Sequence, residues 1–196
     1  MNTFTIKSLK GEEIHPYITA LAELRIAVFK EYPYLYEGSL EYEINYLKTY
    51  VNCPQTTLIL AFDKDRVIGA STAIPLEFET PECQQPFIEN DFKLSSIFYL
   101  GESVLLPAYR GQGVYKHFFA GRESAARKYG SLYTAFCAVV RQEDDKRRPQ
   151  HYVPLDSIWQ KFGYKKHPQI TAYYSWTEIG DTKQTTKPMM FWIKTL

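Results

Sequence analysis

The chain has 196 residues and a formal net charge of +1, with 45% hydrophobic and 16% aromatic residues. A charge so close to zero gives no electrostatic reason to expect binding to nucleic acid or to a membrane surface. No apolar run approaches the ~18 residues of a membrane-spanning helix. We therefore expect a single globular domain over residues 1–196.

Local patterns predict a mixed α/β protein. Apolar runs, alternating or continuous, predict strands, at residues 3–9, 57–62, 67–78, 97–106, 132–140, 171–178 and 189–195. Apolar residues at helical spacing predict helices, at residues 14–32, 40–50, 114–129 and 154–162. Ser39 is expected to cap the second helix, and residues 80–86 are expected to form a loop.

The cysteines and the first residues bear on the compartment. Cys53, Cys83 and Cys137 have neither disulfide nor metal-ligand spacing, and the four histidines are scattered. The start of the chain lacks the apolar core of a signal peptide. These features predict a cytoplasmic protein that holds no metal.

The most informative stretch runs from an apolar strand into a helix. Pro107 ends the strand because it has no N–H to give to a sheet, and the sequence Arg110-Gly111-Gln112-Gly113 precedes the helix. The first N–H groups of a helix have no internal partner, and the helix dipole adds positive charge there. Glycines let a phosphate approach the backbone, and arginine adds a cation. The junction therefore predicts an anion site; a plain glycine turn is the alternative.

Two segments of the chain resemble a known family. Residues 105–114, Leu-Leu-Pro-Ala-Tyr-Arg-Gly-Gln-Gly-Val, resemble the acetyl-CoA-binding signature of the GNAT superfamily of N-acyltransferases. Residues 158–164, Ile-Trp-Gln-Lys-Phe-Gly-Tyr, are similar to a later motif of that family. The resemblance covers roughly the whole chain. It implies a central mixed, largely antiparallel sheet flanked by helices and splayed at its fourth and fifth strands, with acetyl-CoA as co-substrate in the opening.

The resemblance also implies which residues hold acetyl-CoA. Main-chain groups beside the pantetheine arm are expected from Val104, Leu105 and Leu106. Contacts to the phosphates are expected from Arg110, Gly111, Gln112, Gly113, Val114 and Tyr115. The family usually carries Gly or Ala where Tyr115 stands, and this bulky side chain would crowd the phosphates unless it points away from them. Trp159 is expected to pack against the cofactor arm.

Acetyl transfer to an amine requires the amine to lose a proton, since a free alkylamine has a pKa near ~10. Glu102 is the only charged residue in the strand over residues 97–106 and is the candidate general base. The alternative is a structural carboxylate satisfied by a neighbouring Arg or Tyr. Trp159 stands where many relatives carry the tyrosine that protonates the departing thiolate, which an indole cannot do. If CoA does not leave as a thiolate, the candidate acids are Tyr152, Tyr109, Tyr115 and Tyr164.

Two connections are candidates for recognising the acceptor. In the GNAT fold the loop after the first helix overhangs the acceptor site, and here that loop displays three tyrosines. The connection over residues 141–156 carries many charges. The alternatives are ordinary burial of the tyrosines and a solvated loop whose charges pair among themselves. The candidate acceptor-binding residues are Tyr32, Tyr34, Tyr36, Arg141 and Arg148.

The sequence leaves three functions to separate. The first is an acetyl-CoA-dependent N-acetyltransferase that moves the acetyl group directly to a primary amine of a small molecule or peptide, as a monomer or homodimer. The second is a non-catalytic acyl-CoA-binding protein of the same fold. The third is a nucleotide-binding module of another α/β fold, although the chain has no Walker lysine or dinucleotide glycine triplet.

Overall fold

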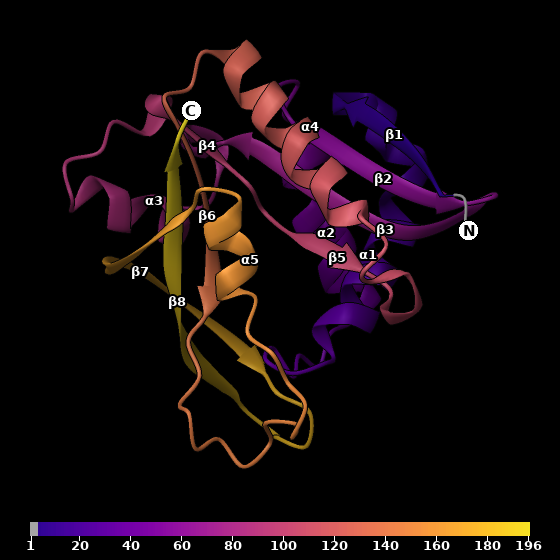
Figure 1. Ribbon diagram of the computed structural model, residues 1–196, viewed down its shortest axis with the longest axis vertical. Coiled ribbons are helices and arrows are strands. Elements are labelled where there is room, and N and C mark those ends of the chain that lie inside the picture. The colour runs from indigo at the N-terminus through magenta and orange to yellow at the C-terminus, as the bar shows by residue number, and fades with distance from the viewer. Residues whose placement is uncertain (1–3) are drawn as a thin grey trace.

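The computed structural model describes residues 4–196 and contains one eight-stranded mixed sheet (Figure 1). The strand order is β1-β2-β3-β4-β6-β8-β7, and β5 pairs with β3 outside this path. Every pairing is antiparallel except that of β4 with β6. The mixed, largely antiparallel sheet predicted from the sequence is thus confirmed. The strands are β1 Thr5–Lys10, β2 Thr57–Asp63, β3 Arg66–Pro75, β4 Ile97–Tyr99, β5 Ser103–Leu105, β6 Tyr133–Val139, β7 Lys165–Thr177 and β8 Gln184–Thr195.

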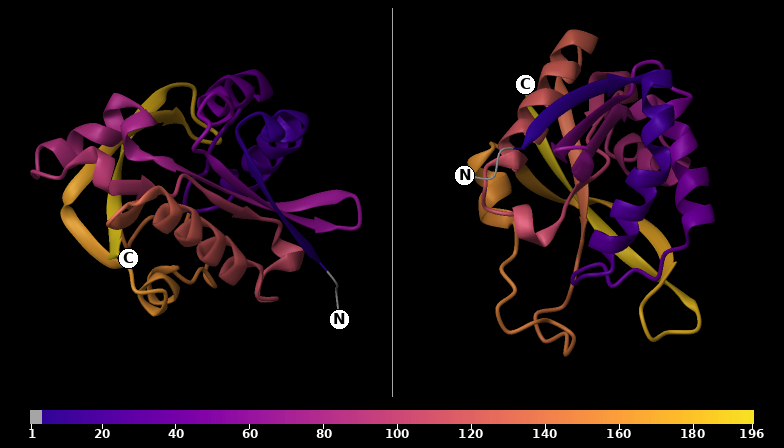
Figure 2. Two further views of the ribbon diagram at one scale, coloured as in Figure 1. Left: turned by 90° about the horizontal axis from the view of Figure 1, so that it is seen from above. Right: turned by 90° about the vertical axis from the view of Figure 1, so that its right-hand side faces the viewer.

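Helices cover both faces of the sheet (Figure 2). The α-helices are α1 Ile18–Phe29, α2 Leu40–Val51, α3 Pro81–Ile88, α4 Val114–Tyr129 and α5 Asp156–Lys161. Short 3-10 turns occupy Gly11–Tyr17, Leu76–Phe78, Leu94–Ser96 and Pro107–Tyr109. Helices α1 and α2 lie on one face, and α4 and α5 lie on the other. None of the helices in this part of the chain is long and apolar enough to cross a membrane.

The sheet splits in the middle of the strand that the sequence predicts over residues 97–106. β4 runs beside β6 from Ile97 to Tyr99, whereas β5 pairs with β3. Gly101 lies at this break, because a Cβ there would stand 2.4 Å from Tyr50 Oη and 2.6 Å from Thr72 Oγ1. The predicted single strand is therefore wrong, and the predicted splay of the sheet is present at this point.

The apolar core fills both sides of the sheet. The largest cluster lies under α1, α2 and α3 and includes Leu21, Leu47, Ile74 and Phe87, which are fully buried. One smaller cluster lies under α4 and includes the buried Phe118. Another lies around α5. Burial of α4 on β2 and β3 fixes the direction in which its first turn points.

Several predicted boundaries differ from the structure. The helix expected from residue 14 begins at Ile18, because Pro16 falls in the preceding 3-10 turn. The loop expected over residues 80–86 is part of α3, which starts with Pro81, a residue well suited to the first helical turn. Ser39 caps α2 as predicted, its hydroxyl accepting from the Tyr42 amide at 3.3 Å. Thr3, at the start of the first predicted strand, lies outside the described residues.

Candidate functional site

A cavity of about 1210 Å³ opens where the sheet splits. Its walls come from the end of α1, from β5, β6 and β8, from α4 and α5, and from the two connections predicted to contact the acceptor. Among the predicted site residues, those that line it are Tyr32, Tyr34, Glu102, Leu105, Arg110, Gly111, Gly113, Val114, Tyr115, Arg141, Arg148, Tyr152 and Trp159. The structure thus brings most of these dispersed residues to one place.

Four predicted site residues do not line the cavity. Val104 alternates with its neighbours on β5 and packs into the main core. Leu106 also packs against the core, and Gln112 is exposed, with its side-chain amide donating to the Ala108 carbonyl at 2.9 Å. The backbone of Tyr36 instead forms an isolated antiparallel β-bridge with that of Glu178. The backbone roles expected of Val104, Leu106 and Gln112 do not depend on where their side chains lie.

The turn before α4 has the geometry of an anion cradle. Gly111 and Gly113 have φ angles of +76° and +86°, in the left-handed region that favours glycine. A Cβ on either glycine would meet nothing within 4 Å, so the space beside them is open. In residues 4–196, no hydrogen-bond acceptor faces the backbone amides of residues 111–115. These features fit a phosphate group that approaches the backbone at the positive end of α4.

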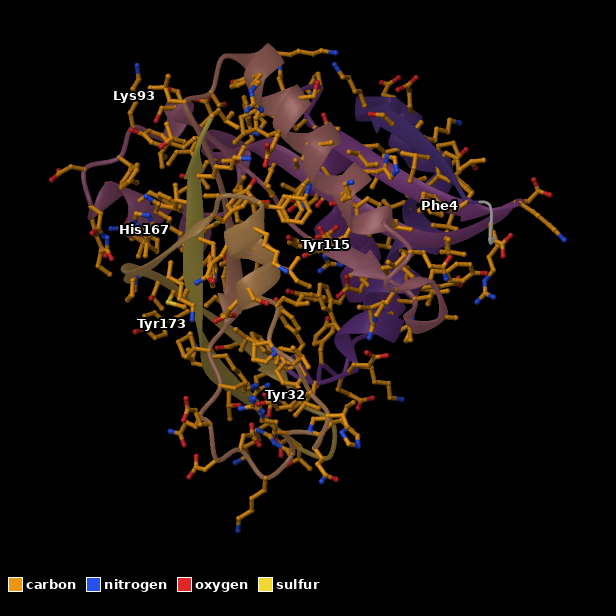
Figure 3. All side chains as sticks on the ribbon, viewed as in Figure 1. Phe4, Tyr32, Lys93, Tyr115, His167 and Tyr173 are labelled. Carbon is orange, nitrogen blue, oxygen red and sulfur yellow. The ribbon has the colours of Figure 1, made fainter. Side chains whose placement is uncertain are left out.

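Tyr115 turns away from the cradle and does not crowd it. Its ring lies near the middle of the molecule, between α4 and α5 (Figure 3). Its hydroxyl accepts a hydrogen bond from Trp159 Nε1 at 3.1 Å. Its ring packs against Phe119 at a centroid distance of 5.1 Å and against Phe162 at 6.3 Å. The bulky side chain therefore leaves the backbone amides open and joins the two helices across the cavity.

Glu102 is buried and forms an ion pair with Arg25 from α1. The same guanidinium also binds Glu43 of α2 through its Nε. Oε1 of each carboxylate is buried without a hydrogen-bond partner among the described residues. Burial raises the pKa of Glu102 above the ordinary 4.5, and the charge on Arg25 opposes this rise. Two carboxylates thus share one cation, and Glu102 is the one that faces the cavity.

Solved structures identify this fold. A ribosomal-protein-alanine N-acetyltransferase from Brucella melitensis matches with a TM-score of 0.63 at 13% identity, over 98% of this chain and 99% of that one. A candidate acetyltransferase from Salmonella typhimurium, solved with acetyl-CoA, matches with a TM-score of 0.59 at 10% identity, over 100% and 95%. A candidate acetyltransferase of the GNAT family from Desulfovibrio desulfuricans matches with a TM-score of 0.57 at 10% identity, over 97% and 99%.

The chain has the GNAT fold. Comparison of the sequence with protein-family models and with curated proteins gives no match. At identities this low the likeness shows the fold alone, and the chemistry depends on the residues of the cavity itself.

At one end of the GNAT opening the two predicted acceptor connections meet. The rings of Tyr32 and Tyr152 pack edge to face at a centroid distance of 4.7 Å. The Arg148 guanidinium lies over the Tyr152 ring, 5.6 Å from its centroid. Burial raises the pKa of Tyr152 above 10.0, and that of Tyr34 is raised for the same reason. This end of the cavity is aromatic, and the Arg148 guanidinium lies at its edge.

Arg141, predicted to contact the acceptor, braces the loop after α1. Its Nε donates to the Pro33 carbonyl at 2.6 Å, and its Nη2 donates to the Tyr34 carbonyl at 3.1 Å. Nη2 also lies 2.5 Å from Oε1 of the buried Glu178. Because these donors are engaged within the protein, Arg141 shapes the acceptor end of the cavity through the loop that it holds.

Two of the four candidate acids lie away from the GNAT opening. The Tyr109 hydroxyl donates to Asp63 at 2.6 Å, and the Tyr164 hydroxyl is buried beside Thr134 and Glu123. Neither residue lines the cavity. Tyr115 and Tyr152 do, so they are the phenols of the predicted set that can reach a bound substrate.

Arg25, Glu43 and Arg122 belong to the site, although no motif in the sequence marks them. Arg25 interrupts the apolar pattern of α1, which is the one local sign of its burial. Arg122 is almost wholly buried, and its Nη1 donates to the Glu102 carbonyl at 3.1 Å. Within residues 4–196 there is no group of three or more His, Cys, Asp or Glu side chains placed to hold a metal ion.

Proposed function

We propose that the chain is an acetyl-CoA-dependent N-acetyltransferase that moves the acetyl group directly from the thioester to a primary amine. The observation that carries the proposal is one cavity that joins the glycine cradle at the start of α4 to the buried carboxylate of Glu102. Its volume of about 1210 Å³ exceeds the ~300–1,000 Å³ typical of a pocket for one small ligand. That space supports the binding of two substrates.

The cradle residues would hold the phosphates of acetyl-CoA. The free amides of residues 111–115 would donate to the phosphate oxygens, and Arg110 would add a cation. Leu105 on β5, with its backbone neighbours, would lie beside the pantetheine arm, and Trp159 would pack on the other side. Bound in this way, acetyl-CoA supplies an activated acetyl group; the protein supplies orientation.

Glu102 is the base in this proposal. Its free Oε1 is the acceptor for a proton of the amine. Tyr32, Tyr34, Tyr152 and Arg148 would contact the rest of the acceptor. We propose that the acceptor is a small-molecule or peptide amine with an apolar or aromatic part.

The second candidate is a non-catalytic acyl-CoA-binding protein. It is favoured by the ion pair between Glu102 and Arg25, because the charge on Arg25 opposes the rise that burial gives the pKa of Glu102, and by Trp159 in place of a tyrosine. This function needs the cradle and the arm site and makes no use of a base.

Thermal unfolding with acetyl-CoA, CoA and ATP tests the binding part of both candidates. A ligand at ~100 times its Kd adds about 2.7 kcal/mol, which at this chain length is a rise of at least 5 °C at ~2–4 °C per kcal/mol. We expect acetyl-CoA and CoA, and not ATP, to raise the melting temperature. A rise with ATP alone would indicate the nucleotide-binding module.

Release of free thiol from acetyl-CoA in the presence of a panel of aromatic, aliphatic and peptide amines then separates the two candidates. An amine-dependent release, with the acetylated amine detected by mass spectrometry, supports the acetyltransferase. Binding of CoA without release for any amine supports the second candidate. We further propose a reducing compartment such as the cytoplasm, because Cys53, Cys83 and Cys137 are all buried free thiols.

A further inference from the structure

The hydrogen bond between Trp159 and Tyr115 fixes which way the phenol can act. An indole N–H is a donor only, so Trp159 must donate and the Tyr115 oxygen must accept. The hydroxyl hydrogen of Tyr115 is consequently left for another acceptor. The rings of Phe119 and Phe162 pack against the phenol and hold it in place.

Tyr115 differs from the other phenols that line the cavity. Tyr32 and Tyr152 pack against each other in the acceptor connections, and Tyr34 packs against Phe29 at a centroid distance of 4.7 Å. Tyr115 is the second residue of α4 and the last of the cradle. Its hydroxyl meets Trp159, the residue expected to pack against the arm of acetyl-CoA that carries the thioester.

We propose that Tyr115 is the acid that protonates the departing thiolate, and that Trp159 positions its phenol. The inference rests on the proposed acetyltransferase function. As the amine nitrogen bonds to the acetyl carbon, the carbon–sulfur bond breaks and its electron pair stays on sulfur. The hydroxyl proton of Tyr115 passes to that sulfur, giving CoA as a thiol and Tyr115 as a phenolate. The phenolate regains a proton from water, and the amine proton leaves through Glu102.

The surroundings of Tyr115 suit this exchange. Burial raises the pKa of Tyr115 above 10.0, which keeps the phenol protonated before the reaction. The Trp159 hydrogen bond, the nearby charge of Arg122 and a Ser103 hydrogen bond act in the opposite direction and would stabilise the phenolate. Trp159, which cannot supply a proton, instead holds the group that can.

The test measures the pKa of the CoA thiol while CoA is bound to the protein. The ultraviolet absorbance of the thiolate is recorded during a pH titration. A phenol that donates to sulfur stabilises the thiolate, so we expect the bound thiol to titrate about one pKa unit lower in the wild type than in Tyr115→Phe. Trp159→Phe should give a smaller shift in the same direction. The double variant Tyr115→Phe with Trp159→Tyr, which returns a phenol to the same contact, should recover the wild-type value.

Tyr109→Phe is the matched control, because Tyr109 belongs to the same segment but bonds to Asp63 outside the cavity. Its bound thiol should titrate as in the wild type. Amine-dependent thiol release by Tyr115→Phe should fall about 10²-fold, at the low end of what general acids contribute, with CoA affinity unchanged. If CoA binds the wild type and Tyr115→Phe, and its thiol has the same pKa in both, Tyr115 is not the acid, although the cofactor site is supported. If CoA does not bind the wild type, the proposed function fails and this role with it.

Discussion

Arg110 Nη1 lies 2.9 Å from Oε2 of Glu31, so the arginine at the start of the cradle is already paired with a carboxylate just beyond α1. Arg110 Nε also donates to the Leu105 carbonyl at 3.3 Å. The Arg110 and Glu31 side chains are 47% and 43% exposed, so solvent screens the pair. In the proposed function, a phosphate that binds at this turn competes with Glu31 for the arginine.

Glu31→Gln should bind CoA more tightly than the wild type. The change frees Arg110 and removes a negative charge beside the phosphates. Exposed pairs contribute up to about 1 kcal/mol, so we expect a decrease in Kd of up to about fivefold. The gain should shrink in high salt. Calorimetric titration with CoA measures it, with Glu12→Gln, an exposed carboxylate on the first 3-10 turn, as control. Unchanged or weaker binding by Glu31→Gln would argue against phosphates at this turn.

Gly113→Ala should weaken CoA binding, whereas Gly130→Ala should not. Both glycines have a left-handed φ, +86° and +91°, and an added Cβ would meet nothing within 4 Å at either site. The strain of about 1–2 kcal/mol is thus the same for both, and both variants should lose similar thermal stability. Only the Cβ at Gly113 enters the space beside the cradle. Equal CoA affinities for the two variants would contradict the cradle.

Glu102→Gln should lower amine-dependent turnover about 10²-fold while CoA affinity stays close to that of the wild type. Glu43→Gln is the matched control, because Glu43 binds the same Arg25 but does not line the cavity. Both changes disturb the buried ion pairs and should destabilise the fold to a similar extent. Denaturant unfolding measures the loss of stability. Turnover should fall much more in Glu102→Gln than in Glu43→Gln. Equal turnover losses would mean that Glu102 acts only through packing and charge.

The pH profile gives a second test of Glu102. Burial raises its pKa above 4.5, and a base works only when ionised. Turnover of the wild type should therefore rise as the pH increases through that raised pKa, and the variant Glu102→Gln should lack this ascending limb. The stability of the fold should change with pH in the opposite direction to turnover. A carboxyl group whose pKa is raised by folding stabilises the folded state at low pH, and this contribution disappears as the pH rises through the raised pKa.

Glu178→Gln should loosen the acceptor end of the cavity. The buried Glu178 carboxylate receives Arg141 and Arg147, and Lys187 Nζ lies 3.6 Å away. Burial disfavours its charge, but hydrogen bonds from Arg141 and Arg147 outweigh this and hold its pKa below 4.5. A folded pKa that is depressed stabilises the protein above the unfolded value and loses that effect as the pH falls through the folded one.

We expect Glu178→Gln to lose about 1–3 kcal/mol of stability at neutral pH, the cost of an unsatisfied buried partner. The difference from the wild type should narrow as the pH falls below 4.5. Urea unfolding at several pH values measures it, and Asp144→Asn, an exposed position in the same connection, is the control. A KM for the amine that rises while CoA affinity holds would confirm that this cluster supports the acceptor end. A difference that widens in acid would contradict the role of the Glu178 charge.

The sequence alone determined the features that depend on neighbours along the chain. Pro107 ends the strand, Gly111 and Gly113 supply the left-handed turn, and Gly130 closes α4. These are local requirements of backbone sterics and of helix ends, so a short window of residues suffices to predict the glycine turn and the helix that follows it. The same windows predicted α2 with its Ser39 cap.

Which side chains meet in the cavity depends on contacts between distant parts of the chain. Arg25 and Glu102 are 77 residues apart, Tyr115 and Trp159 are 44 apart, and Arg141 reaches Pro33 across 108 residues. Such contacts depend on how the helices pack on the split sheet, and that packing is set by long-range burial that no local pattern encodes. The sequence could therefore nominate Glu102, Tyr115 and Arg141 as chemical groups. Packing against distant partners made the first an ion-paired carboxylate, the second an oriented phenol and the third a brace for a loop.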